Sequence, residues 1–311
     1  MENYRELLAL RAAELYYYEN LTQGAIAERM NCTRWTVGRL LDEARESGIV
    51  RISINHPRAR IRELENELRE AFGLRDAVVV KAQGSDAATV GLVAASASDF
   101  ITSQRPRPGS LGIAWGRTLT AVARAMPDNW TSGLEVYQTY GGLVRSNDDE
   151  VADSIGLMAR RGRGVGHMLP APAIVTDAEL GFRLRREPSV ARTLAAGPSS
   201  DLMIYSPGVL EAESVLVKSG FLSENGMERL RSMGAVTDIF SHFLDEDGNP
   251  VSKELEARTI AVSLDDIRRS KMLLLVASGP AKVRPTRVAV RSGLAHVVIT
   301  DGDTAQGILD L

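Results

Sequence analysis

The spacing of hydrophobic residues changes along the chain, and the change falls near residue 55. Before it, apolar side chains recur every three or four positions, as they do on helices with one buried face. From Ala77 onward, short runs that are apolar throughout alternate with helical stretches. A length of 311 residues suits two domains. We therefore predict one domain over residues 1–55 and a larger α/β domain over residues 56–311.

Residues 21–41 have the pattern of two short helices joined by a tight turn. The inner faces are apolar, with Ala25, Ile26 and Met30 in the first helix and Val37, Leu40 and Leu41 in the second. Thr22 and Thr33 precede the helices, where a side-chain oxygen can satisfy backbone N–H groups as an N-cap. An earlier helix over residues 3–18 is expected to pack behind them, with an inner stripe of Leu7, Leu8, Ala12, Leu15 and Tyr16.

Polar and basic side chains gather on the outer side of the second helix near its start. This layout is typical of a helix-turn-helix, whose second helix enters the DNA major groove by its N-terminal residues. The residues expected at DNA are Thr22, Gln23, Thr33, Arg34, Trp35, Thr36 and Arg39. A helical hairpin packed inside a larger core is the alternative. Residues 46–48 end the helix and residues 49–54 alternate like a strand, which favours a winged DNA-binding domain.

The distribution of charge agrees with a nucleic-acid contact at this end of the chain. The formal net charge is −3, yet residues 20–60 carry seven arginines against four acidic residues. The positive segment is therefore the helix-turn-helix, where phosphates would be neutralised.

Cysteine and histidine usage gives no sign of a disulfide framework or a metal site. The single cysteine, Cys32, lies in the predicted turn, and the four histidines are scattered without ligand spacing. We expect no metal and no cofactor. The N-terminus lacks a signal-peptide core, and no apolar run approaches the roughly 20 residues that span a bilayer. A cytoplasmic protein without membrane partners is the simplest interpretation.

Residues 61–72 predict a charged linker helix between the domains. Its apolar positions at 61, 64, 68 and 71 have the spacing of a short coiled-coil seam. Self-association through this seam and packing on the C-terminal domain are both open at this point.

The larger domain is expected to be an α/β fold with a largely parallel sheet covered on both faces, because its strands are apolar throughout and helices separate them. The predicted strands are residues 77–81, 111–115, 134–139, 202–205, 259–262, 272–277 and 296–300. The predicted helices are residues 85–103, 117–126, 149–161, 223–232, 281–291 and 303–310.

Ligands of open α/β sheets bind beyond the carboxyl ends of the strands. The best such loop here is residues 112–120, where a strand ends at Trp115, Gly116 turns, and Arg117 opens a helix. A helix start of this kind can bind an anion, although a glycine after a strand is also simply a turn. Lys282 lies at another predicted helix start, as an anion ligand or as a solvated surface lysine.

The chain resembles the SorC family of sugar-responsive bacterial transcription regulators, also grouped with the deoxyribonucleoside regulators. Seven stretches carry the resemblance: residues 22–44, 112–118, 169–172, 234–239, 245–248, 263–267 and 298–301. Each is weak alone, but together they extend over nearly the whole chain. The resemblance implies a winged helix-turn-helix and an effector domain similar to sugar-phosphate isomerases and glucosamine-phosphate deaminases, without catalytic residues.

The resemblance also implies an effector site for a phosphorylated sugar or polyol. Its phosphate loop corresponds to Gly112, Trp115, Gly116, Arg117 and Thr118, its second glycine loop to Gly141 and Gly142, and its further contacts to Asp238 and Lys282. Two departures affect the sugar pocket: Ser206-Pro207-Gly208 replaces the usual Gly-Ile-Gly, and Thr237 stands where glycine is frequent.

We therefore predict a regulator of a carbohydrate or polyol catabolic operon that binds operator DNA and acts as a homodimer or homotetramer. The first alternative is a sugar-phosphate isomerase or deaminase with Asp238 as general base, although no histidine or glutamate partner lies near it in the sequence. A protein-docking module is the second, and the arginine and threonine pattern of the second helix disfavours it.

Overall fold

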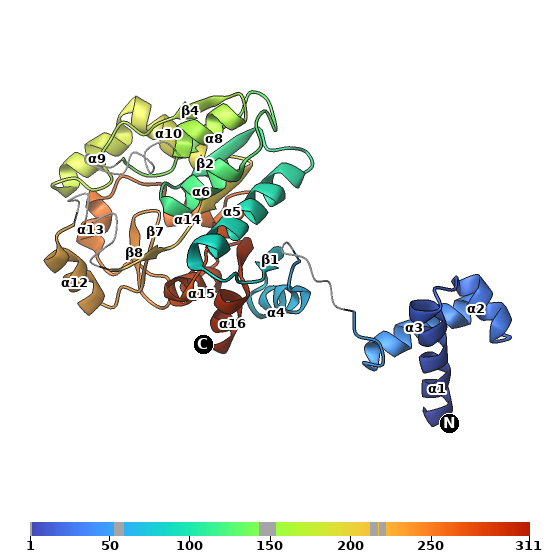
Figure 1. Ribbon diagram of the computed structural model, residues 1–311. Helices are drawn as coiled ribbons and strands as arrows, with labels where there is room; N and C mark the ends of the chain where they lie inside the picture. The colour runs from blue at the N-terminus through green and yellow to red at the C-terminus, as the bar shows by residue number, and fades with distance from the viewer. Residues whose placement is uncertain (1, 53–58, 143–153, 212–216, 218–221) are drawn as a thin grey trace. The chain divides into compact units, whose positions relative to one another are not determined.

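The computed structural model describes residues 2–52, 59–142, 154–211, 217 and 222–311 (Figure 1). The chain divides into two compact units, Met1–His56 and Pro57–Leu311. Each unit has its own hydrophobic core, and each is described by itself below.

The first unit is helical in its described residues. It consists of α1 (Glu2–Ala13), a π-helical turn η1 (Glu14–Tyr18), α2 (Gln23–Arg29) and α3 (Arg34–Glu46). The predicted caps are present: Thr22 Oγ1 accepts from the Ala25 N–H at 3.2 Å and Thr33 Oγ1 from the Thr36 N–H at 3.1 Å. Asn31 makes the turn with a φ of 51°, a left-handed conformation that asparagine tolerates.

Two expectations for this unit are corrected. Leu7 and Tyr16 are exposed, and Ala9 and Ala13 complete the inner face of α1 and η1 instead. The strand expected over residues 49–54 is not formed in residues 49–52, and residues 53 and 54 lie outside the described residues. Ile49 and Val50 instead pack on the helical core, and the Val50 N–H donates to the Ala44 carbonyl at 2.9 Å. The alternating pattern thus belongs to a half-buried segment that follows α3 and is not a strand.

In the described part of the second unit, a seven-stranded sheet has the order β1-β10-β9-β5-β2-β3-β4. The strands are β1 (Asp76–Val80), β2 (Ser110–Ile113), β3 (Glu135–Gln138), β4 (Val165–His167), β5 (Leu202–Tyr205), β9 (Leu273–Val276) and β10 (Val297–Asp301). Every neighbouring pair is parallel, which confirms the predicted α/β class. All the loops at the carboxyl ends of the strands therefore lie along one edge of the sheet.

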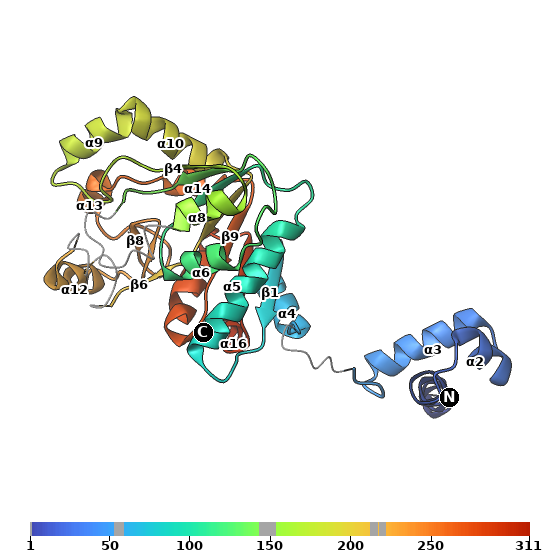
Figure 2. The same ribbon diagram turned by 45° about the horizontal axis from the view of Figure 1, so that its top comes forward.

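Helices cover both faces of this sheet (Figures 1 and 2). The helices described in this unit are α4 (Arg62–Phe72), α5 (Asp86–Ser103), α6 (Arg117–Ala125), α8 (Ser154–Arg161), α9 (Ala178–Arg186), α10 (Pro188–Ser199), α12 (Glu224–Ser232), α13 (Lys253–Arg258), α14 (Leu264–Arg268), η2 (Pro280–Lys282), α15 (Val283–Arg291) and α16 (Gly302–Asp310). Successive strand residues enter opposite cores: Val79 belongs to the core that includes residues of α4, α15 and α16, and Val80 to the core that includes residues of α5, α6 and α8. Burial on both faces is why these strands read as unbroken apolar runs.

A small antiparallel sheet of β6 (Gly208–Val209), β7 (Thr237–Ile239) and β8 (His242–Leu244) lies outside this pattern. The strand predicted at residues 259–262 is wrong, because Thr259 and Ala261 form only isolated bridges, to Ile174 and Tyr140. An apolar run of four residues does not distinguish a strand from a buried extended connection.

The predicted linker helix is α4, and it packs on its own domain. Leu68 is 1% exposed in the core beneath the sheet, with Leu64 and Phe72 packed against the same cluster. The apolar seam is therefore occupied within the chain. Among the described residues, no helix has the length and apolar character required to span a membrane.

Candidate functional site

The outer surface of α3 is basic and aromatic at its start. Arg34 is exposed, Trp35 is 71% exposed, and the Arg39 guanidinium lies 5.0 Å from the centre of the Trp35 ring. Stacking of this kind orders the arginine before any ligand arrives. The hydroxyls of Thr33 and Thr36 are hydrogen-bonded to each other at 2.8 Å, so both side chains take part in the N-cap of α3.

A pocket of about 680 Å³ lies at the carboxyl ends of the parallel strands. Its walls come from the connections that follow β1, β2, β5, β9 and β10, together with Asp238 of β7. After β2, the chain adds β3 and β4 on one side of that strand and β5, β9 and β10 on the other. The order of the strands therefore reverses between β2 and β5, and α/β proteins bind ligands at such a switch point. Six of the predicted effector residues line it: Trp115, Gly116, Arg117, Thr118, Asp238 and Lys282.

The start of α6 forms one side of the pocket. Gly116 adopts a φ of 145°, which L side chains rarely adopt, and α6 begins there without a side-chain cap. The first N–H groups of this helix, at Arg117 and Thr118, therefore face the pocket as donors with the positive end of the helix dipole behind them. An anion fits this position.

Lys282 is half-buried and lies within electrostatic reach of Arg117. Burial, opposed by Asp238 and reinforced by Arg117, lowers the pKa of Lys282 to about 8. The ammonium donates to the Pro207 carbonyl, which leaves two of its three protons for a ligand. Arg117 and Lys282 both line the pocket, and the repulsion between these two cations favours an anionic ligand there, which argues against a solvated surface lysine.

Asp238 supplies a buried carboxylate to the same pocket. Burial raises its pKa to about 6, although His242, the Ser241 N–H and Lys282 lower it in part. Its Oδ1 is a buried atom with no hydrogen-bond partner in the described structure. Asp238 also lines the pocket, so its carboxylate is an acidic group available to the hydroxyls of a ligand.

His242 stabilises the carboxylate from behind and is itself held firmly. Its Nδ1 lies 2.7 Å from Glu256, and its Nε2 lies 2.8 Å from the Val262 carbonyl. Burial lowers the pKa of His242, but Glu256 outweighs it and the net direction is upward. With both ring nitrogens engaged, the imidazole is a support for Asp238 and is poorly placed to move a proton.

An aromatic wall closes another side. The rings of Trp115 and Tyr140 lie 4.8 Å apart, and Phe240 follows at 6.5 Å from Tyr140. The Trp115 indole donates to the Gly141 carbonyl at 3.2 Å, and the Tyr140 hydroxyl donates to the Trp115 carbonyl at 3.2 Å. The wall is therefore rigid and offers apolar surface to a sugar ring.

Three predicted effector residues do not line the pocket. A Cβ at Gly112 would lie 2.7 Å from the Gly197 carbonyl oxygen, and one at Gly141 would lie 2.3 Å from the Pro172 backbone. The N–H groups of Gly141 and Gly142 already donate to the carbonyls of Ile260 and Ala171. At Gly112 and Gly141 the glycine thus permits close packing, and no phosphate contact follows from any of the three.

Other pocket residues had not been singled out from the sequence. They follow β1, β5, β9 and β10 and include Gln83, Asp86, Thr89, Glu211, Ser278, Asp301 and Asp303. Asp301 accepts from the Gly279 N–H at 3.1 Å and the Thr304 N–H at 2.9 Å, so it fixes two pocket loops. The signal was available, because each of these loops follows a predicted strand end. Among the described residues, no group of three or more His, Cys, Asp or Glu side chains could hold a metal ion.

The different surroundings of Gly141 and Gly142 give a direct test of this correction. We expect Gly141→Ala to destabilise the effector domain by about 1–3 kcal/mol through overpacking. Gly142→Ala is the control, because its new Cβ would make only ordinary contact, 3.6 Å from Gln138 Nε2. Thermal or urea unfolding checks both variants, and equal stability of the two would contradict the packing role.

Comparisons with known proteins agree with this layout. A family profile described as "Putative sugar-binding domain" matches residues 56–310. The chain is 30% identical over 312 residues to the deoxyribonucleoside regulator of Bacillus subtilis (strain 168), covering 100% of this chain and 99% of that one. It is 28% identical over 304 residues to the erythritol catabolism regulatory protein EryD of Brucella abortus (strain 2308), covering 97% and 96%.

Solved structures show the same fold. A DeoR family transcriptional regulator from Listeria monocytogenes superposes with a TM-score of 0.70 at 25% identity, covering 79% of this chain and 98% of that one. The full-length sorbitol operon regulator SorC from Klebsiella pneumoniae superposes with a TM-score of 0.70 at 22% identity, covering 98% and 99%. Each of these proteins is named as a regulator, which excludes the isomerase or deaminase interpretation.

Proposed function

The chain belongs to the SorC family of sugar-binding transcriptional regulators, and we propose that it reads operator DNA with α3 and binds a phosphorylated sugar or polyol in the pocket at the strand ends. As a family member it is a sugar-responsive DNA-binding regulator and not an enzyme. The names of its relatives support control of a carbohydrate or polyol catabolic operon.

The observation that carries the effector proposal is that one pocket combines two kinds of group. Arg117, Lys282 and the uncapped start of α6 supply charge-assisted donors for a phosphate. The Asp238 carboxylate and the Trp115 ring, which line the same pocket, supply an acceptor and an apolar face for the carbon chain and its hydroxyls. A phosphorylated polyhydroxy compound has this combination of groups.

The proposal assigns residues 1–55 to DNA binding and residues 56–311 to the effector. The division of the chain into two compact units, Met1–His56 and Pro57–Leu311, supports this assignment. Thr22, Gln23, Thr33, Arg34, Trp35, Thr36 and Arg39 remain the proposed DNA contacts. We also propose that the protein is cytoplasmic. We propose that it acts as a homodimer or homotetramer, because paired helix-turn-helix modules read two half-sites of an operator.

A thermal-shift screen of the full-length protein tests the proposed effector. The compounds are 2-deoxyribose 5-phosphate, erythritol 4-phosphate and glucose 6-phosphate, each beside its unphosphorylated parent. A ligand at a hundredfold excess over its Kd stabilises the folded protein by about 2.7 kcal/mol. We expect at least one phosphate to raise the Tm and its parent to leave it unchanged. Stabilisation by the parents alone would contradict the phosphate assignment.

A further inference from the structure

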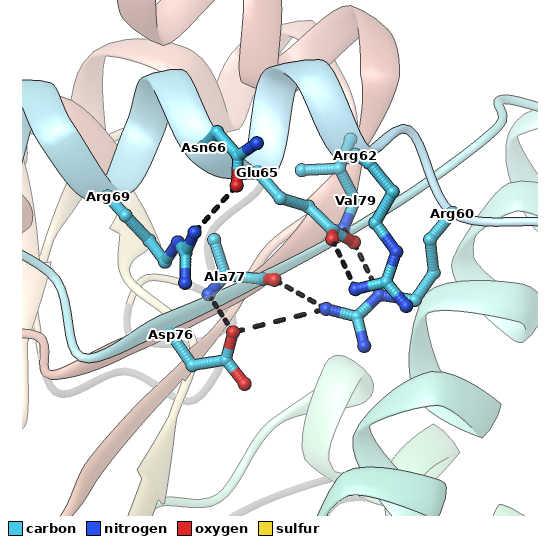
Figure 3. Close-up of polar contacts among 8 residues, drawn as sticks. All are labelled: Arg60, Arg62, Glu65, Asn66, Arg69, Asp76, Ala77 and Val79. Carbon is cyan, nitrogen blue, oxygen red and sulfur yellow. Dashed lines mark hydrogen bonds and ion pairs between the residues drawn. The ribbon is translucent and has the colours of Figure 1, made fainter. Parts of the chain in front are cut away.

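Glu65 is a buried carboxylate that the effector pocket does not use. It lies on α4, and its side chain is 3% exposed. A buried charge is costly unless it is paired and hydrogen-bonded, so its partners indicate what it holds in place. Figure 3 shows these partners converging on it from three segments of the chain.

The partners of Glu65 join the linker to the edge of the sheet. Oε1 accepts from Arg60 Nε and from the backbone N–H of Val79 in β1, the latter at 3.0 Å. Oε2 accepts from Arg62 of the same helix at 3.1 Å. Arg60 also donates through Nη2 to the Ala77 carbonyl at 2.8 Å, so its guanidinium spans from α4 to β1 (Figure 3).

The backbone repeats the connection that the side chains make. The Ile61 N–H donates to the Val79 carbonyl at 2.7 Å, and Arg60 forms an antiparallel bridge with Val80. Residues 60 and 61 therefore cover the outer side of β1, which is an edge strand of the sheet. Edge strands need such cover.

The same segment contacts the wall of the effector pocket. A Cβ at Gly302 would lie 2.7 Å from Ile61 Cδ1, so Ile61 packs directly on this glycine. Gly302 stands between Asp301 and Asp303, which both line the pocket. β1 itself continues into the loop that carries Gln83 and Asp86 to the pocket. Two short paths thus connect the ligand site to the point where the linker enters the domain.

We propose that Arg60, Ile61 and Glu65 form a clasp on β1 through which occupancy of the pocket changes how firmly the linker of the DNA-binding unit is held. This inference rests on the proposed function of the pocket. Arg60 and Glu65 are positioning residues in it, since neither lines the pocket. A ligand that orders the loops after β1 and β10 tightens the clasp. By thermodynamic linkage, breaking the clasp lowers the affinity of the pocket for that ligand.

Hydrogen exchange of the full-length protein tests the clasp with inorganic phosphate as the probe. The Ile61 and Val79 amides donate across the clasp, so their exchange reports its opening. We expect saturating phosphate to slow exchange at Arg117 and Thr118 and also, about threefold or more, at Ile61 and Val79. In Arg60→Met the effect at Arg117 and Thr118 should remain, and the effect at Ile61 and Val79 should disappear.

Arg62→Met is the matched control, because it removes a hydrogen bond to the same carboxylate from within α4 and leaves the linker attached. Arg60→Lys, which keeps the charge, should retain part of the response and guards against a folding defect in Arg60→Met. Phosphate protection confined to the pocket amides would overturn the clasp and leave the proposed function standing. Absence of protection at Arg117 and Thr118 would overturn the phosphate site and the clasp with it.

Discussion

Replacing Arg34 and Arg39 together with alanine is expected to abolish most specific DNA binding. Each arginine that contacts a base edge contributes about 1–3 kcal/mol, so the double variant should lose roughly 30-fold to 20,000-fold in affinity. Both side chains are exposed on the first turns of α3, and Arg39 is already ordered by its stacking on Trp35. Fluorescence anisotropy at one salt concentration, with the duplex that the wild-type protein selects from randomised DNA, measures the loss.

Arg45→Ala provides the control on the same helix. Arg45 is an exposed arginine in the last turn of α3, paired with Asp42, and it lies away from the end that enters the groove. Its loss should change affinity less than about threefold, as expected for a surface ion pair. Wild-type affinity of the double variant, or an equal loss in Arg45→Ala, would refute the assignment of the α3 start.

Replacing Lys282 with methionine is expected to remove the preference for a phosphorylated effector. A hydrogen bond to a charged group contributes about 1.5–3 kcal/mol, so affinity for the phosphate hit should fall at least tenfold. Methionine preserves the buried stem, and affinity for the unphosphorylated parent should stay unchanged. Lys271→Met is the matched control, because Lys271 pairs with Asp201 at 2.9 Å and does not line the pocket. Isothermal titration calorimetry separates the two.

The pH dependence of binding follows from the same lysine. Its pKa of about 8 means that it is charged at pH 7 and largely neutral at pH 9. Phosphate affinity should therefore fall about tenfold over this interval, and the fall should be absent in Lys282→Met. The contribution of Lys282 to the stability of the unliganded fold has the opposite sign. Because burial lowers its pKa, the folded state binds fewer protons between about pH 8 and 10.5, and stability rises with pH there.

Much of the fold could be predicted from local patterns. The threonine caps at Thr22 and Thr33, the strand at residues 202–205 and the parallel arrangement of the sheet all rest on information within a few residues. Capping and periodicity are properties of one segment, so they can be read without knowing its neighbours. The resemblance to the SorC family rests likewise on short motifs, and three residues that it points to, Arg117, Asp238 and Lys282, line one pocket.

Failures occurred where a segment depends on a distant partner. Residues 49–52 alternate like a strand but have no neighbouring strand in the described unit, and they pack on helices instead. Gly141 follows a strand, as the glycines of ligand-binding loops do. Here the residue is glycine because the Pro172 backbone leaves no room for a side chain. Neither outcome is visible in the local sequence, since the deciding atoms come from elsewhere in the chain.

Local sequence was enough to predict the helix-turn-helix, the parallel α/β domain and the cations of the pocket, because helix and strand periodicity, end caps and strand-end loops are encoded locally. Which of these groups lie together in space depends on the folded chain. The parallel sheet brings Gln83, Arg117 and Lys282 to one cleft, the antiparallel strand β7 adds Asp238, and the packing of α4 buries Glu65 against β1. Burial and the loss of hydrogen-bonding water act only after the chain has folded, and they turn ordinary charged residues into a binding site.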